Sequence, residues 1–420
     1  MDHGSDLMRS CEKYLSQTLM GRSFDEVRFL EYMEPVFKRL GYRVLDRTKR
    51  ECILVIRLDG LTGAVLTTGF LRELRQNKPQ ACIVLVTDEN SASLMEQCPY
   101  IDEMHSFSLK RNMAFQEMFR FVYHFCQKYL WNRNYDLCLL PKWGDSSVGT
   151  ILLAYLSGAR ERIGFASVEL SQKSSLNRNL DVFLTEVLEA PADVIHETAR
   201  GYYLLQRAGM KIAHDELELW TAAHVQEKVE RFLSNHLYGR PFIAVGIGAS
   251  QASCKYPVDK YLKAFQKIAE TGMQFVLLGG AELDLEGQFF LRQMPRGSVI
   301  NLIGQTRLPI LAAVLSKAML YIGNENDLVA MAAACEIPVI ELLAEAEDKM
   351  DEPAVYSSYE RFFPWKTPSI ILRPTKALPP CNETAVLGGC CTMMPHCIRL
   401  VEPEDIVKAY REMMEYLEYA

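Results

Sequence analysis

Short apolar runs alternate with longer amphipathic stretches along most of this chain. Residues 53–56 are four apolar residues in a row, which is typical of a strand buried on both faces of a sheet. A short turn over residues 59–63 follows, and apolar spacing near 3.6 residues then runs from Val65 to Leu74. This order predicts a strand, a tight loop and a helix, the opening unit of a parallel α/β domain. Ligands of such sheets bind at the carboxyl ends of the strands, so we expect the turn to border a cleft.

The same pattern returns in the second half of the chain. A buried strand is predicted over residues 242–246, a helix over 258–270, and further strands over 275–280, 320–323 and 338–343. Two such repeats joined by a linker predict an α/β protein of two Rossmann-like lobes with a cleft between them, plus an N-terminal helical extension. The expected parts are the extension over 1–50, a first Rossmann-like lobe over 51–220, an interdomain connection over 221–240, a second Rossmann-like lobe over 241–400 and a C-terminal helix over 401–420.

Three other segments carry weaker signals. Residues 111–131 have aromatic side chains at helical spacing with basic flanks, so they form either a core helix or a helix that lies on a membrane surface. Residues 158–165 are predicted to form a turn and an edge strand. The region from about 345 to 400 is rich in proline and cysteine and is expected to be irregular.

Composition narrows the class of protein. With 420 residues, 49% hydrophobic and 24% charged, the chain fits a globular protein of two domains. A net charge of -7 argues against nucleic acid as the main partner. The sequence shows no secretory signal pattern and no apolar run near the roughly 20 residues that span a bilayer. Twelve cysteines in such a chain indicate reduced thiols. We therefore expect a cytoplasmic protein with at most peripheral contact with the inner face of the membrane.

A loop of small residues, Gly248-Ala249-Ser250, follows the strand predicted at 242–246. Small residues let backbone amides approach a phosphate, and the N-terminus of the next helix adds a partial positive charge. Lys255, at the end of this loop, would neutralise a diphosphate without a metal ion. The spacing is not that of a Walker A loop, and the alternative is that Lys255 is a solvated loop lysine.

Acidic and amide residues follow two other predicted strands of the second lobe. Glu282 comes just after a Gly-Gly pair and could accept hydrogen bonds from ribose hydroxyls, as acidic residues do in dinucleotide sites. Glu325 and Asn326 follow the strand at 320–323 and could bind hydroxyls of a sugar or a nucleoside. The alternative is that Glu282 is a carboxylate favoured by a helix dipole, and that Glu325 and Asn326 only cap the next helix.

The densest cysteine cluster consists of Cys381, Cys390, Cys391 and Cys397. It lacks the paired C-x2-C units of a zinc ribbon, so loosely packed thiols are favoured over a metal knuckle. The sequence therefore assigns no metal ligand, and no cofactor is expected.

Five short motifs occur in order along the chain. They are Ile56-Arg57-Leu58-Asp59 with Val65-Leu66-Thr67-Thr68, Gly158-Ala159-Arg160-x-Arg162-Ile163-Gly164-Phe165, Gly248-Ala249-Ser250 with Lys255-Tyr256-Pro257, Asn301-Leu302-x-Gly304, and Ile322-Gly323-Asn324. Together they resemble glycosyltransferase family 9, the ADP-heptose:lipopolysaccharide heptosyltransferases and their relatives. The similarity runs from about residue 52 to the final helix and leaves only the N-terminal extension outside it.

The resemblance implies a GT-B fold, in which the first lobe binds the acceptor and the second lobe binds a nucleotide sugar. It also implies transfer with inversion of the anomeric centre and without an essential metal ion. In the family, an aspartate in the opening loop deprotonates the acceptor hydroxyl, and a lysine after the G-A-S loop stabilises the leaving diphosphate. The lysine corresponds to Lys255, and the donor-binding candidates are Gly248, Ala249, Ser250, Glu282, Glu325 and Asn326.

Two departures from the family pattern bear on catalysis. The G-D pair of the opening motif falls on Thr62-Gly63, the expected acceptor loop, so Gly63 stands where the family has its catalytic aspartate. Asp59 is the only nearby carboxylate in this loop and is therefore the candidate base. In the motif N-D-[ST]-G-P-x-H this chain keeps an acid as Glu325 but lacks the glycine, the proline and the histidine.

The sequence is thus interpreted as that of a glycosyltransferase. It would move heptose or a related sugar from a nucleotide-diphosphate donor, expected to be an ADP-sugar, to a cell-envelope glycan or glycolipid acceptor. Two alternatives are a catalytically degenerate GT-B protein that acts as a binding or scaffold subunit, and a glycosyltransferase that modifies a protein.

Overall fold

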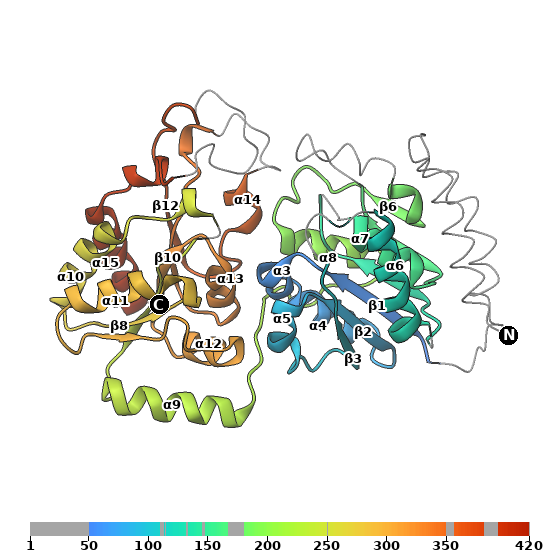
Figure 1. Cartoon of the computed structure of the whole chain (residues 1–420), viewed down its shortest axis with the longest axis horizontal. Helices are drawn as coiled ribbons and strands as arrows, with labels where there is room; N and C mark the ends of the chain where they lie inside the picture. Colours follow the sequence, from blue (N-terminus) through green and yellow to red (C-terminus); the bar gives the residue numbers. More distant parts are fainter. Residues whose placement is uncertain are drawn as a thin grey trace.

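The computed structural model describes residues 50–419 except for 110–112, 114, 132, 145–147, 167–179, 250, 350–356 and 382–393. Two six-stranded sheets form the cores of two halves that lie side by side, the N-terminal half in blue to green and the C-terminal half in yellow to red (Figure 1). The expected helical extension, apart from its last residue, lies outside the described residues. None of the described helices is both long enough and apolar enough to cross a lipid bilayer.

The N-terminal sheet is parallel throughout, and its strand order is β3-β2-β1-β4-β5-β6. β1 (Cys52–Arg57) lies in the middle and is buried along its whole length, as its apolar run predicts. Leu54 and Ile56 pack on one face of the sheet, and Ile53 and Val55 pack on the other. The other strands are β2 (Cys82–Thr87), β3 (Glu103–Ser106), β4 (Leu137–Leu140), β5 (Glu161–Phe165) and β6 (Glu186–Leu188).

Helices cover both faces of this sheet. Side chains of α6 (Phe115–Phe125) and α7 (Val148–Leu156) pack over one face, and those of α4 (Thr68–Asn77) and α8 (Glu197–Arg207) pack over the other. The remaining helical elements of this half are α3 (Gly60–Leu66), α5 (Glu89–Met95), the π-helical turn η1 (Cys126–Leu130) and the 3-10 turn η3 (Leu180–Phe183).

The C-terminal sheet repeats this connectivity, with strand order β12-β11-β10-β7-β8-β9 and parallel pairing throughout. Its strands are β7 (Phe242–Gly246), β8 (Gln274–Leu278), β9 (Val299–Asn301), β10 (Leu320–Asn324), β11 (Val339–Leu342) and β12 (Ser369–Leu372). Both sheets therefore have the order of a Rossmann fold, which confirms the two predicted Rossmann-like lobes.

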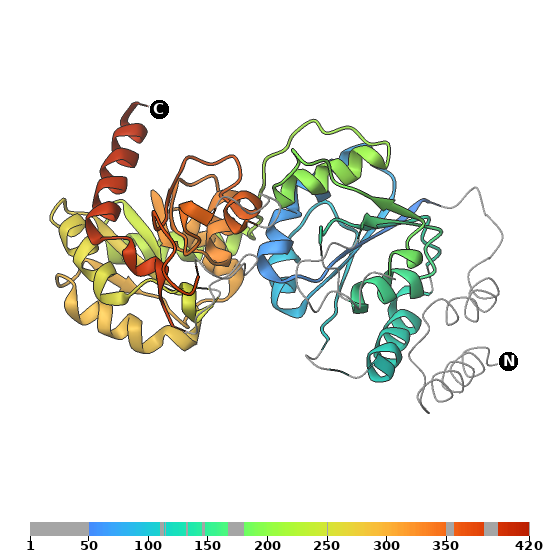
Figure 2. The ribbon, with the colours of Figure 1, turned by 90° about the horizontal axis from the view of Figure 1, so that it is seen from above.

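The helices of the C-terminal half are α10 (Val258–Ala269), α11 (Asp284–Gln293), α12 (Leu308–Leu315), α13 (Asp327–Ala334), α14 (Ser358–Phe362) and α15 (Pro403–Tyr419), with 3-10 turns η4 (Ala252–Cys254), η5 (Ala281–Leu283), η6 (Glu347–Lys349) and η8 (Cys397–Leu400). The last helix, α15, packs against α10. Seen from above, it lies on the side of this half that is far from the N-terminal half (Figure 2).

Four elements differ from the sequence-based expectations. The first helix begins at Gly60, because residues expected as a loop already form its first turn, and it breaks at Thr67 before α4 starts. β5 is not an edge strand, since the short β6 pairs with its outer side. The aromatic helix ends at Phe125 and continues as a π-helical turn. The region expected to be irregular contains the sixth strand, β12, whose four residues are too few for a periodic signal.

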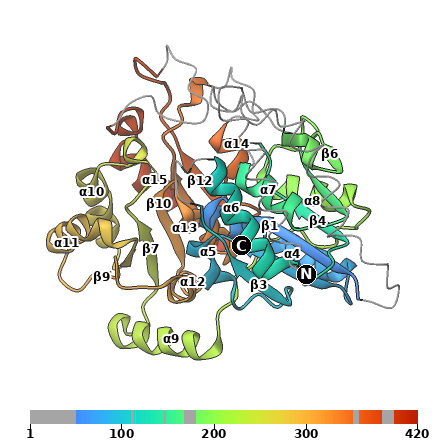
Figure 3. The ribbon, with the colours of Figure 1, turned by 45° about the vertical axis from the view of Figure 1, so that its right-hand side comes forward.

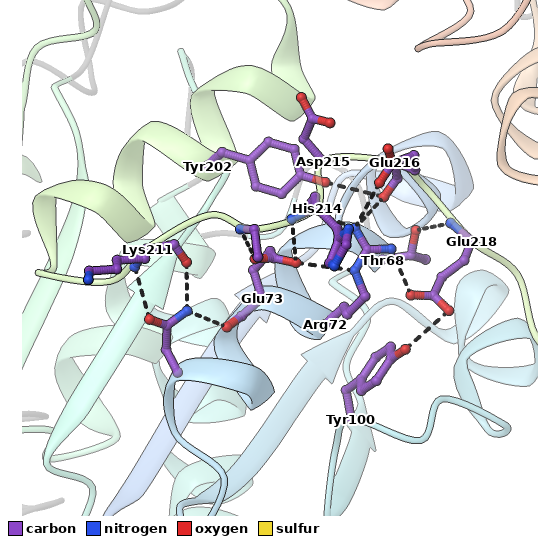
Figure 4. Close-up of polar contacts among 12 residues, drawn as sticks. Thr68, Arg72, Glu73, Tyr100, Tyr202, Lys211, His214, Asp215, Glu216 and Glu218 are labelled. Atoms are coloured by element: carbon purple, nitrogen blue, oxygen red, sulfur yellow. Dashed lines mark hydrogen bonds and ion pairs between the residues drawn. The ribbon is translucent and has the colours of Figure 1, made fainter.

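The chain between the halves runs as an extended segment over residues 209–222 and then as α9 (Ala223–Leu237), which packs against α12 below the C-terminal half (Figures 1 and 3). The extended segment is held on α4 by a polar network (Figure 4). The fully buried Glu73 carboxylate accepts hydrogen bonds from the backbone amides of Ala213 at 2.6 Å and His214 at 3.3 Å. Arg72 donates to Glu218 at 3.1 Å and to two backbone carbonyls of the segment.

The two halves meet through an apolar interface with polar contacts at its edge. Val65 and Leu66 of α3 belong to the same buried cluster as Val329 and Ala330 of α13. At the edge of this contact, the backbone amide and the hydroxyl of Thr62 both donate to Asp327, at 3.0 and 2.6 Å. The opening loop of the N-terminal half is therefore held against a helix of the C-terminal half.

Replacing Glu73 by Gln is expected to destabilise the protein by about 2–4 kcal/mol, because a neutral amide offers one acceptor oxygen to two backbone N–H donors and loses the charge that faces Arg72. Urea unfolding followed by circular dichroism measures the change. Glu216→Gln is the matched control in the same segment. Its side chain is 51% exposed, and it should change stability by less than about 0.5 kcal/mol. Equal effects of the two substitutions would contradict the anchoring role of Glu73.

Candidate functional site

A cavity of about 720 Å³ lies between the two halves. Its walls come from the segments that follow β1, β4, β7, β8 and β10, so it sits at the carboxyl ends of both sheets, where the strand order reverses. The polar and small residues that line it are Asp59, Thr62, Gly63, Lys142, Gly248, Ala249, Gly279, Gly280, Glu282, Thr306, Glu325, Asn326, Asp327, Glu341 and Arg361. The structure thus brings together eight of the ten residues selected from the sequence. Of the other two, Ser250 lies outside the described residues, and Lys255 is described below.

Asp59 occupies the position that a side chain at residue 63 would need. A Cβ atom built on Gly63 would lie 2.1 Å from Oδ1 and 2.4 Å from Cγ of Asp59. The Asp59 carboxylate therefore lies within the first turn of α3, over the residue that corresponds to the family's aspartate. The shift of four residues in sequence is one helical turn, and this turn brings residues 59 and 63 onto the same face.

Arg57 fixes the orientation of this carboxylate. Its Nε and Nη2 atoms donate to Oδ1 and Oδ2 of Asp59 at 2.6 and 2.8 Å, the paired geometry of a strong arginine–carboxylate bond. Arg57 itself is buried at the end of β1. Its Nη2 atom also lies 3.7 Å from Glu197, so that a second carboxylate faces the same guanidinium.

Glu197 is the centre of a buried charged cluster that spans the two halves. Its side chain is 1% exposed, and it forms ion pairs with Arg57, with Arg200 at 3.8 Å and with Arg361 of α14. Arg200 also lies over the ring of Trp143, 3.5 Å from its centroid, and burial lowers the pKa of Arg200 to about 10. Next to this cluster, burial lowers the pKa of His196 to about 4, and its Nε2 atom lies 3.0 Å from the carbonyl of Phe363.

Asn326 builds the floor of the cavity. Its side-chain oxygen accepts from the amide of Leu328 at 2.8 Å and caps α13, as the alternative interpretation of the sequence proposed. Its side-chain nitrogen donates to the carbonyl of Gly248 at 2.7 Å. The cap thus ties the end of β10 to the loop after β7, and both loops are expected to face the donor.

Glu282 lies on the turn η5 at the mouth of the cavity and is exposed. Its carboxylate covers Gly280, where a Cβ atom would lie 2.2 Å from Oε2.

Lys255 is not among the residues that line the cavity. Its Nζ atom forms an ion pair with Glu286 of α11 at 2.5 Å, and its side chain is 23% exposed. This pairing lowers the pKa of Glu286. The loop that carries Lys255 does reach the cavity through Gly248 and Ala249, so the expected role of this lysine requires its amine to leave Glu286.

Two carboxyl groups share the inner wall of the cavity. Burial, together with repulsion from Glu345, raises the pKa of Glu325 to about 7. Burial, together with repulsion from Glu325, raises the pKa of Glu341 on β11 well above its ordinary value. Within the described part of the chain neither group forms an ion pair with a lysine or an arginine. Both shifts favour the protonated form, and a protonated carboxyl can act as both donor and acceptor toward sugar hydroxyls.

Four residues of the site escaped the sequence analysis. Glu341 interrupts an apolar strand, and a charged residue in such a run is a signal that could have been used. Trp143 follows the carboxyl end of the apolar run that forms β4, and a large aromatic residue at the end of such a run is also a usable signal. Glu197 begins α8, and Arg361 lies in the region expected to be irregular, so only the fold brings these two together.

Comparisons with known proteins agree with this architecture. Residues 127–359, more than half of the chain, match the family described as glycosyltransferase family 9 (heptosyltransferase). The chain belongs to glycosyltransferase family 9. Lipopolysaccharide heptosyltransferase 3 from Escherichia coli (strain K12) is 24% identical over 289 residues, which cover 67% of this chain and 79% of that protein.

Solved structures of the family show the same fold. The family 9 protein from Veillonella parvula DSM 2008 superposes with a TM-score of 0.68 at 18% identity, covering 87% of this chain and 97% of that one. The E. coli ADP-heptose lps heptosyltransferase II superposes with a TM-score of 0.63 at 18% identity, and the match covers 87% of this chain and 99% of that one. E. coli heptosyltransferase WaaC with ADP superposes with a TM-score of 0.59 at 14% identity, and the match covers 87% of this chain and 98% of that one. The GT-B fold expected from the motifs is confirmed.

The Glu325–Glu341 pair predicts a pH dependence of stability. Glu325 ionises near pH 4.5 when unfolded but near pH 7 when folded, so the folded state binds the extra proton between these values. Its contribution to the free energy of unfolding is complete below about pH 4.5 and is lost as the pH rises through about 7. Glu325→Gln should therefore reduce the fall in stability between about pH 5 and 8, measured by urea unfolding at several pH values. Glu282→Gln, an exposed control at the same cavity, should leave the slope unchanged. A slope in Glu325→Gln equal to the wild-type slope would contradict the proton uptake.

Proposed function

We propose that this chain transfers a sugar from a nucleotide-diphosphate sugar to a hydroxyl group of a cell-envelope glycan, with inversion and without a catalytic metal ion. The observation that carries this proposal is the position of the Asp59 carboxylate. It lies on the cavity, over Gly63, where the family motif has its catalytic aspartate. Asp59 belongs to the I-R-L-D motif that this chain shares with the family, so the chain keeps one of the two aspartates of the opening motif, and that carboxylate lines the cavity.

Asp59 acts as the general base in this proposal. It would accept the proton of the acceptor hydroxyl while that oxygen attacks the anomeric carbon and the bond to the diphosphate breaks. When Asp59 becomes neutral, Arg57 would lose its nearest counterion. Glu197, 3.7 Å from the same guanidinium, remains as a second one. The buried cluster thus allows the proton transfer without leaving Arg57 unpaired.

The C-terminal half binds the donor in this proposal. Backbone amides near Gly248 and Ala249 would face the diphosphate, Glu282 the ribose, and the Glu325–Glu341 pair the hydroxyls of the sugar. Solved relatives support an ADP-linked donor: one structure of E. coli WaaC holds ADP and another holds ADP-2-deoxy-2-fluoro heptose. The similarity to a lipopolysaccharide heptosyltransferase supports heptose or a related sugar, and a glycan or glycolipid of the cell envelope as acceptor.

The second candidate function is that of a binding or scaffold subunit. The absence of the motif's aspartate at Gly63, and of its proline and histidine at Leu328 and Ala330, favours this alternative. A scaffold subunit would bind the donor without transferring the sugar, so measuring both ADP binding and sugar transfer distinguishes it from a transferase.

Asp59→Asn should lower the rate of sugar transfer at least about 100-fold, because an amide cannot accept the proton of the acceptor hydroxyl. ADP affinity measured by calorimetry should stay within about twofold of wild type. Asp88→Asn, which changes the cap of α5 away from the cavity, is the matched control. Normal transfer by Asp59→Asn would overturn the role of Asp59. Absence of transfer by the wild-type chain over a panel of nucleotide sugars and glycan acceptors would favour the scaffold function.

Moving the carboxylate offers a sharper experiment. Gly63→Asp alone should be poorly active or unstable, because the new Cβ would lie 2.1 Å from Oδ1 of Asp59. The double variant Asp59→Gly with Gly63→Asp removes this clash and moves the carboxylate from residue 59 to the position of the aspartate in the family's G-D pair. It should recover a substantial part of the transfer rate that Asp59→Gly loses. A double variant no more active than Asp59→Gly would contradict the equivalence of the two positions.

Lys255→Ala should weaken ADP binding roughly 10- to 100-fold, the effect of one charge-assisted contact with the diphosphate. Glu286→Gln frees the amine from its ion pair and should leave ADP affinity equal to wild type or higher. Lys267→Ala, whose partner Glu404 lies on the surface, is the matched control. Calorimetry with ADP measures all three variants. Unchanged affinity in Lys255→Ala would show that the amine stays with Glu286 and does not bind the donor.

A further inference from the structure

Three metal-ligand side chains converge outside the cavity, in the C-terminal half. The Sγ atoms of Cys381 and Cys397 lie 3.7 and 3.3 Å from Nδ1 of His396. All three donor atoms lie within 4.8 Å of one another. Both cysteines are buried and the histidine is partly buried. Among the described residues this is the one group of three or more His, Cys, Asp or Glu side chains close enough to hold a metal ion.

The two sulfur–nitrogen distances fit a tetrahedral site. With zinc–sulfur bonds of about 2.3 Å and zinc–nitrogen bonds of about 2.0 Å, a sulfur and a nitrogen ligand of one ion lie about 3.5 Å apart. The two measured separations lie on either side of this value. Hydrogen bonding explains the geometry less well, because the single lone pair of Nδ1 accepts a proton from only one thiol at a time.

The surroundings also suit a thiolate ligand. The backbone amide of Leu378 donates to Sγ of Cys397 at 3.4 Å, the kind of outer contact that orients a coordinating sulfur. The two cysteines form a small apolar cluster with Ala346 and Ala377, separate from the large cores of both halves. So few side chains bury little apolar surface, and a metal ion would supply the stability that this corner lacks.

We propose that Cys381, His396 and Cys397 bind one thiophilic divalent transition-metal ion, zinc by the nature of the ligands, as a structural clip. Cys381 lies nine residues after the end of β12, whereas His396 and Cys397 lead through η8 into α15. The ion would join these two segments and fix the start of the last helix. Structural zinc is four-coordinate, so water or a further side chain completes the site. None of the three residues lines the cavity, so the clip is independent of the proposed transfer reaction.

The spacing explains why the sequence favoured loose thiols. Cys381 and Cys397 are 16 residues apart, and the histidine, which precedes Cys397 directly, was not counted with the cysteines. Two of the four cysteines selected from the sequence, Cys390 and Cys391, lie outside the described residues.

The full chain, purified without chelator or affinity metal, should contain about one equivalent of zinc by plasma mass spectrometry. Cobalt added to the metal-depleted chain should give the charge-transfer absorption of a cobalt–thiolate bond. Cys381→Ser combined with Cys397→Ser should lose both signals, whereas Cys335→Ser, a cysteine beside α12, should keep them. Removing the metal should lower the thermal midpoint and leave ADP affinity unchanged, which separates this site from the donor site.

Two results would overturn the proposal. One is a wild-type chain without bound metal that also gives no thiolate absorption with cobalt, a measurement that does not depend on how any variant folds. The other is metal that stays bound in the double variant, since it would then be held elsewhere. These two results do not depend on whether Lys255→Ala weakens ADP binding, so the metal site and the donor site are tested separately.

Discussion

The arrangement of the two halves depends on one buried carboxylate. Glu197 lies in the N-terminal half with almost no exposure, and arginines from both halves surround it. Removing it would leave three guanidinium groups facing one another away from water, a cost of several kcal/mol. The same cluster holds Arg57, and through it Asp59, in place. The geometry of the proposed catalytic base and the contact between the halves therefore have a common origin.

The cavity follows from the repetition of one fold. Each sheet reverses its strand order beside its first strand, and each reversal opens a crevice at the carboxyl ends of the strands. The contact of α3 with α13 turns these two crevices toward each other. Loops that are far apart in sequence, such as those at Thr62 and Asp327, thereby become walls of one site. The two sides of the cavity differ in their charged groups. Arginines lie near Asp59 in the N-terminal half, whereas carboxyl groups with raised pKa values lie in the C-terminal half.

The sequence predicted correctly those features that depend on a single strand or a single motif. Apolar runs located the central strands, and the motifs located the loops that line the cavity. Position in space was harder to predict. In an extended loop Asp59 would lie more than 10 Å along the chain from residue 63 at about 3.3–3.6 Å per residue, but a helical turn brings the two together. Lys255 was expected on the cavity, yet its ion-pair partner is Glu286, because an ion pair between a loop and a helix 31 residues further on leaves no trace in sequence spacing.

The anchoring of the interlobe segment decides how this molecule could open. Residues 211–218 are fastened to α4, and α9 is packed on α12, so the few residues between Trp220 and Ala223 are the ones left to act as a pivot. Parting the halves about that pivot would separate Arg361 from Glu197 and Thr62 from Asp327. Access to the interior is thus coupled to the breaking of polar contacts at the cavity wall, and a bound ligand that replaced those contacts would decide when the two halves close.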